Sequence, residues 1–199
     1  LRIVVSFANL ALAGFVLSAV AVRFAFPAVS LEGRAFWILQ SAPVSLRALV
    51  WRKFWLVFVP LLSLGELLIF SSNLLLHVPS WMMVISLITV FLMTFGITAI
   101  GIGLGALYPN FNYENAAEIP TSFGGAIAMI LSVAFIAVAV ILEAWPVYQL
   151  TIASLRYARV TAPTTGVLAP AMIAVGVLTA SVVIVSLRIG IKRLEQLRD

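Results

Sequence analysis

Ionisable side chains are scarce in this sequence, and their positions limit the chemistry that it can support. The only histidine is His77 and the only aspartate is Asp199, so a Ser-His-Asp triad would have to join residues from distant parts of the chain. Metal clusters of histidine and cysteine are excluded, because the chain has one histidine and no cysteine. It also lacks a Gly-x-x-x-x-Gly-Lys-Ser/Thr loop for the phosphates of ATP. We expect no catalytic residues, no metal site and no cofactor bound by this chain itself.

Glu66 is the most unusual ionisable residue, because it lies inside a long apolar run. It follows Lys53 by roughly 20 Å of helix, which places it near the middle of a bilayer. A carboxyl group at that depth is energetically costly. It is either a functional proton site or a protonated group bonded to a neighbouring helix, helped by Ser63 or Asn73, and the sequence leaves both open. Glu143 receives less weight, because we expect it near the external end of its span.

A polar segment, residues 26–43, separates two long apolar runs near the start of the chain. Ser30 can cap a helix N-terminus, Glu32 lies in the favourable first turn, and Pro43 cannot continue the helix. We therefore predict a short helix of about three turns with one apolar side. Such a helix either lies on the membrane surface or docks onto a cytoplasmic partner.

The elements around these residues are predicted to be membrane-spanning helices. The chain is 63% hydrophobic and 10% charged, with a mean hydropathy of +1.18, as is typical of a membrane protein. Five mostly apolar runs are long enough to cross the hydrocarbon core: residues 3–22, 54–76, 81–107, 121–145 and 167–187. They do not alternate as the strands of a β-barrel would. We predict an all-α, polytopic transmembrane bundle of five spans plus a short cytoplasmic helix, in one domain over residues 1–199.

The basic residues predict the orientation, because Lys and Arg concentrate in short cytoplasmic loops. They are frequent from Arg23 to Lys53 and again from Arg188 onward, two segments that fall on the same side of the membrane. We assign that side to the cytoplasm, together with the connection from Tyr108 to Pro120. The net charge of +5 therefore indicates orientation and attraction to membrane lipid, and it is not evidence for a nucleic-acid partner.

The opposite side holds the remaining connections. We expect a tight turn at residues 77–80 and a longer loop from Pro146 to Gly166. Gly101 and Gly105 are four residues apart on one helix face, and this spacing predicts close helix packing rather than a nucleotide-binding loop.

Two cytoplasmic segments resemble those of a transporter family. The first resembles the segment before a span in type-2 ATP-binding-cassette exporter permeases, and it reads Ser30-Leu31-Glu32-Gly33-Arg34, Phe36-Trp37, Ser41-Ala42-Pro43 and then Lys53. The second resembles a short connection in a bacterial subgroup of such exporters, and it reads Gly103-Leu104-Gly105-Ala106-Leu107-Tyr108-Pro109-Asn110-Phe111 with Glu114-Asn115 and Gly124-Gly125. Their order, spacing and shared side make the resemblance.

The resemblance implies that residues 30–43 form a coupling helix that receives a cytoplasmic P-loop ATPase. The residues implied to bind this partner are Glu32, Gly33, Arg34, Phe36, Trp37 and Pro43. Those implied in the second loop are Tyr108, Pro109, Glu114 and Asn115. ATP and Mg would be bound by the partner ATPase. The chain would act in the bacterial inner membrane, with a second permease half or as a homodimer, and would be the C-terminal part of a permease of about six spans.

The expected function is therefore a permease subunit that couples ATP hydrolysis by a separate ATPase to export, without an enzymatic activity of its own. Two alternatives to this function remain open. One is an ion-coupled secondary transporter that uses Glu66 as its proton site, and the other is a membrane scaffold that transports nothing. The substrate is not indicated, because the apolar spans carry no distinctive polar cluster.

Overall fold

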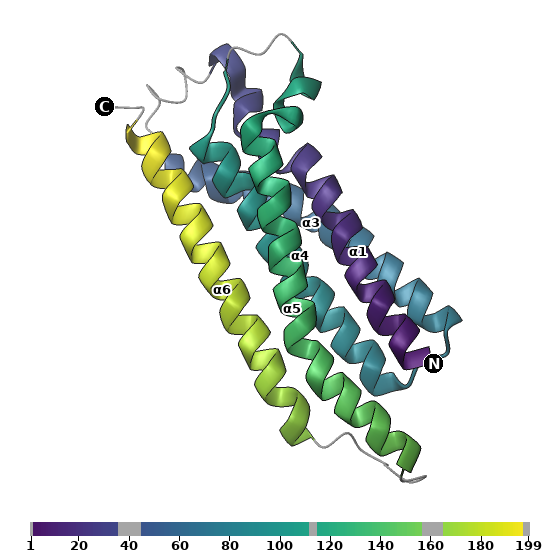
Figure 1. Ribbon diagram of the computed structural model, residues 1–199. Coiled ribbons are helices and arrows are strands. Elements are labelled where there is room, and N and C mark those ends of the chain that lie inside the picture. Colours follow the sequence, from purple (N-terminus) through teal and green to yellow (C-terminus); the bar gives the residue numbers. More distant parts are fainter. Residues whose placement is uncertain (1, 36–44, 112–114, 157–164, 197–199) are drawn as a thin grey trace.

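The protein is a bundle of long helices (Figure 1), and the computed structural model describes residues 2–35, 45–111, 115–156 and 165–196. The long helices are α1 (Arg2–Phe24), α3 (Leu46–Leu75), α4 (Ser80–Leu107), α5 (Phe123–Arg156) and α6 (Thr165–Gln196). Three short 3-10 helices lie between them in the described chain: η1 (Phe26–Ala28), η2 (Ser30–Ala35) and η3 (Ala116–Thr121). Five helices are long and apolar enough to cross a membrane, which confirms the predicted all-α bundle of five spans.

Helix α4 is the central element, because it packs against α1, α3, α5 and α6. Its sequence explains this position, since small and hydroxyl-bearing residues give it a surface that neighbours can approach closely. Gly103 and Gly190 bring α4 and α6 together, and a Cβ atom on Gly190 would lie only 2.6 Å from the backbone oxygen of Gly103. On the other side, a cluster of aromatic rings joins α3 to α4. In it, Phe54 and Phe95 meet edge to face with their centroids 4.9 Å apart.

Local signals in the sequence set the helix boundaries. Helix α3 begins after Ser45, whose hydroxyl oxygen accepts a hydrogen bond from the Ala48 N–H at 3.3 Å and so caps the first turn. It ends at the tight turn predicted around His77, which adopts a positive φ of 50°. The predicted loop starting at Pro146 is wrong, because α5 continues through this proline to Arg156. A proline removes one backbone hydrogen bond, but the apolar residues on both sides keep the segment helical.

The connections divide between the two ends of the bundle (Figure 1). At one end lie η1, η2, η3 and the C-terminal end of α6, and we call this the basic end. The other end holds the α3–α4 turn and the C-terminal end of α5. The cations described at this end are Arg23 in the last turn of α1, Arg47, Arg52 and Lys53 in the first turns of α3, and Arg188, Lys192 and Arg193 toward the end of α6. The grouping of loops therefore agrees with the arrangement that the basic residues predict.

Candidate functional site

The candidate site is the layer of short elements at the basic end, and Phe26 anchors it. The Phe26 side chain is fully buried, in a small cluster with Val22, Ile119 and Ala128. Its ring lies so close to α5 that a Cβ atom on Gly124 would be 2.8 Å from the ring. A Cβ atom on Gly105 would overlap the backbone oxygen of Phe26. The segment that follows α1 thus packs closely against glycines of α4 and α5, where no side chain keeps it apart.

The predicted packing role of Gly101 and Gly105 is confirmed, but their neighbour differs from the expected one. A Cβ atom on Gly101 would lie 2.6 Å from the Cβ of Ala25, and Gly105 faces Phe26. These glycines therefore contact Ala25, which follows α1, and the start of η1 rather than the side of a second long helix. Gly103, between them in sequence, is the residue that faces α6.

Ser30 links the two loops at the basic end. Its side chain is fully buried, and its hydroxyl oxygen accepts a hydrogen bond from the backbone N–H of Asn110 at 3.0 Å. Asn110 lies three residues after the end of α4, so this bond joins the first loop to the second. The sequence predicted that Ser30 would cap a helix. The structure instead uses the hydroxyl for a contact between residues far apart in the chain, which local sequence signals do not reveal.

Glu32 and Lys53 form an ion pair that joins η2 to the first turns of α3. Their side chains are about a quarter exposed, at 26% for Glu32 and 23% for Lys53, so the pair lies at the edge of the packed layer. Both residues belong to the segment that resembles exporter permeases. The ion pair explains in physical terms why an acidic residue and a distant basic residue would occur together.

The predicted regular helix from Ser30 is wrong over its described part. Residues Ser30–Ala35 form 3-10 turns, and the backbone breaks at Gly33, which has φ 52° and ψ −138°. Residues with a side chain rarely adopt a positive φ of this kind, so glycine is suited to this position. Of the other residues implied to bind the partner, Phe36, Trp37 and Pro43 lie outside the described residues, as does the side chain of Arg34.

The second loop contributes Tyr108, Pro109 and Asn115 to the same end of the bundle. Tyr108 ends α4, is 43% exposed, and its ring meets that of Phe123 edge to face at 6.5 Å. Asn115 caps η3, because its side-chain oxygen accepts a hydrogen bond from the Ala117 N–H at 3.0 Å. Glu114 lies outside the described residues.

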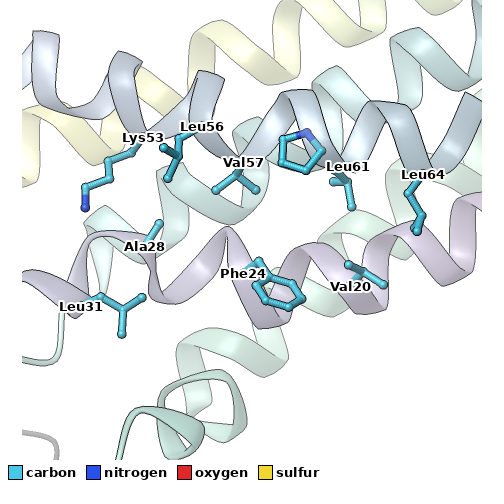
Figure 2. A pocket seen from close by; sticks show the side chains of 10 residues that line it. Val20, Phe24, Ala28, Leu31, Lys53, Leu56, Val57, Leu61 and Leu64 are labelled. Atoms are coloured by element: carbon cyan, nitrogen blue, oxygen red, sulfur yellow. The ribbon is translucent and has the colours of Figure 1, made fainter.

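A groove runs beside the Glu32–Lys53 pair, between the end of α1 with its short helices and the first half of α3 (Figure 2). Its volume is about 480 Å³, and its walls are apolar. Phe24 and Leu31 line one side, and Val57, Pro60 and Leu64 line the other. Lys53 stands at one end. The layer is therefore held to α3 at the ion pair, with open space beside it.

Glu66 lies apart from this layer, further along α3, where its side chain is only partly buried. The two residues that the sequence suggests as its partners make hydrogen bonds to other residues. Ser63 donates to the backbone oxygen of Val59 at 2.9 Å, and Asn73 accepts a hydrogen bond from the Ser6 hydroxyl at 2.6 Å. No hydrogen bond or ion pair joins Glu66 to another residue within the described parts of the chain.

Glu143 is the buried carboxyl group that sequence reasoning underrated. Its side chain is 1% exposed, and one carboxyl oxygen accepts a hydrogen bond from the Thr89 hydroxyl at 2.7 Å, while the other has no partner among the described residues. The expectation of a solvated position near the span's end is wrong, because α5 continues to Arg156, roughly 20 Å beyond Glu143. The residues from Val147 to Arg156 contain no proline or glycine and are compatible with a helix, and this is the sequence signal that Glu143 lies well before the end of α5.

The five membrane-length helices, with two loops joined at a basic end, define a multi-pass helical membrane protein. The family described as "Putative ATP-binding cassette" matches residues 1–198, nearly the whole chain. The chain therefore belongs to this ATP-binding-cassette family. No curated protein and no solved structure matches it.

Proposed function

We propose that the chain is the membrane-spanning permease subunit of an ATP-binding-cassette exporter. The observation that carries the proposal is the pair of contacts made by the first loop. Ser30 bonds the second loop at Asn110, and Glu32 pairs with Lys53 at the start of α3. A partner that moves residues 30–43 would therefore act on α4 and α3 together. We call these residues the coupling segment.

The transmission of movement would follow these contacts. Lys53 is continuous with the membrane-spanning part of α3, and Asn110 follows the central helix α4, which packs against the other long helices. The apolar groove of Figure 2 gives the coupling segment room to shift against α3. Nucleotide binding and release in the partner would then change the packing of the spans and so alternate the access of a substrate.

The ATPase activity is assigned to a separate subunit. The family description refers to an ATP-binding cassette, but this chain has no P-loop sequence and consists largely of apolar spans. ATP and Mg would thus be bound by a cytoplasmic P-loop ATPase, and a second permease half or a second copy of the chain would complete the pathway. The setting is the bacterial inner membrane, with the basic end in the cytoplasm.

Co-purification of the full-length protein with the P-loop ATPase encoded in a neighbouring reading frame tests this proposal. We expect the wild-type chain to retain the ATPase and to stimulate ATP hydrolysis, and we expect Arg34→Glu and Phe36→Ala to weaken both. Ile173→Ala is a suitable control, because Ile173 is 65% exposed and lies in the first half of α6, away from the basic end. If both variants associate with the ATPase and stimulate it as well as wild type does, the segment is not the docking site.

A second candidate function, proton-coupled secondary transport, is favoured by one observation. The carboxyl group of Glu143 is buried, with Thr89 as its single hydrogen-bond donor among the described residues, and a buried ionisable group within a span is costly to keep. Its burial supports Glu143, rather than the partly exposed Glu66, as the proton site in this hypothesis. It requires transport driven by a pH gradient without ATP and lost in Glu143→Gln, and transport that needed ATP would exclude it.

A further inference from the structure

A second groove lies at the basic end, between the first turns of α3 and the last turns of α6. Its volume is about 670 Å³. Arg47 of α3 and Arg188 and Lys192 of α6 line its outer part, with one carboxylate, Glu195. We call it the α3–α6 groove. Its three cations against one anion give it a net positive charge.

Among the described residues, none of these three cations forms an ion pair. Within the described residues the only ion pair is that of Glu32 with Lys53, so no carboxylate lies within 4.0 Å of the three cations. Arg188 and Lys192 are also four residues apart on one helix face, where like charges repel each other. An anion placed between the two helices would relieve this repulsion and would lie near the positive N-terminal end of α3.

The inner part of the groove is apolar. Val183, Ile184 and Leu187 line it about one and a half to two and a half turns before Lys192, in the helix that is apolar enough to cross a membrane. From Val183 to Lys192 the helix rises roughly 14 Å. The groove therefore changes from apolar to basic along the membrane normal, with Trp51 of α3 beside the boundary.

We infer that the α3–α6 groove binds an anionic phospholipid, with its phosphate between Arg47, Arg188 and Lys192 and an acyl chain along Val183 and Ile184. Basic pockets between transmembrane helices are suited to anionic headgroups, and the polarity of the groove matches the direction in which a phospholipid stands in its leaflet. An acidic protein segment would use the cations but would leave the apolar wall uncovered. The groove of Figure 2 differs, because Lys53, the cation that lines it, is already paired with Glu32.

Native mass spectrometry of the purified chain, without the ATPase, tests the inference. The protein is incubated with equal amounts of phosphatidylglycerol and phosphatidylethanolamine that carry the same acyl chains. We expect wild type to retain phosphatidylglycerol preferentially. In the double variant Arg47→Gln/Lys192→Gln its apparent affinity falls by roughly 25-fold, because each basic side chain near anionic lipid contributes about a factor of five.

The matched control is Arg52→Gln/Arg193→Gln. It removes the same charge from the same two helices at the same end, but from exposed residues that do not line the groove. A second pair tests the apolar wall. Ile184→Trp, at a residue that is 48% exposed, should fill the groove and weaken lipid retention. Ile173→Trp should not, because Ile173 is 65% exposed, lies nearer the start of α6 and does not line the groove.

Equal loss in the site and control variants would overturn the inference, because it would show attraction to general charge rather than to a site. Equal retention of the two lipids, or no retention, would overturn it as well. The same spectra report oligomeric state. A dimer that is lost only in the groove variants, with lipid binding unchanged, would mean that a second copy of the chain occupies the groove instead.

Discussion

Glu143 and Thr89 form a contact between α5 and α4 in the interior of the bundle, where water cannot replace a lost partner. Removing the Thr89 hydroxyl would leave the carboxyl group without its hydrogen bond. We expect Thr89→Val, which keeps the side-chain shape, to lower the free energy of unfolding by about 1–3 kcal/mol. The thermal midpoint of the detergent-solubilised protein, followed by tryptophan fluorescence, measures this effect.

Ser71→Ala is the control for the Thr89 variant. The Ser71 hydroxyl is exposed and donates to backbone oxygens of its own helix, those of Leu67 at 2.7 Å and Leu68 at 3.2 Å. Its loss should change the free energy of unfolding by less than about 0.5 kcal/mol. Equal shifts in the two variants would contradict a special role for the buried pair.

Gly105 provides a second test at the scale of single residues. A methyl group there would overlap the backbone oxygen of Phe26, which cannot rotate away, so Gly105→Ala should destabilise the protein by about 1–3 kcal/mol. Gly176→Ala should instead be neutral or stabilising by up to about 1 kcal/mol, because the added Cβ would have no atom within 4 Å beyond the neighbouring residues and backbone of its own helix. The same thermal assay compares them, and a Gly105→Ala protein as stable as Gly176→Ala would show that η1 is not pressed against α4.

At the scale of elements, the ion pair between η2 and α3 is predicted to matter more for coupling than for folding. It is partly exposed, so its contribution to stability is below about 1 kcal/mol. We expect Glu32→Lys to reduce stimulated ATP hydrolysis by about fivefold through loss of that contact, with the thermal midpoint nearly unchanged.

The charge-swapped double variant Glu32→Lys/Lys53→Glu is the informative companion, because it restores an ion pair of opposite polarity. ATP hydrolysis by the reconstituted complex should recover toward the wild-type rate. If the double variant remains as impaired as the single one, the ion pair between η2 and α3 is not the cause of the lost ATP hydrolysis, which contradicts the prediction.

The elements also show what sequence alone can and cannot predict. Apolar runs predict all five spans, because crossing a membrane requires length and hydrophobicity that can be read locally. The hydroxyl of Ser30 and the carboxyl group of Glu143 were misjudged, since their partners Asn110 and Thr89 lie far away in the chain. Which face a helix turns inward depends on its neighbours, and no local pattern records it.

For the whole molecule, the central prediction is that the basic end faces the cytoplasm. Residues 1–199 contain no cysteine, so cysteines can be introduced into them one at a time. A membrane-impermeant thiol reagent should label His77→Cys, in the exposed α3–α4 turn, in intact cells. Asn115→Cys, exposed at the basic end, should be labelled only after the cells are permeabilised. The reverse pattern would show that the orientation is inverted and that no cytoplasmic ATPase could reach the coupling segment.

The most direct test of the account is site-specific crosslinking in cells that produce both the full-length protein and its neighbouring P-loop ATPase. A photo-reactive amino acid is placed at Phe36, in the coupling segment, and in a separate variant at His77, at the opposite end of the bundle. We predict a crosslink to the ATPase from position 36 and none from position 77. No crosslink from position 36, or an equal yield from both positions, would contradict the proposal that this segment receives the ATPase.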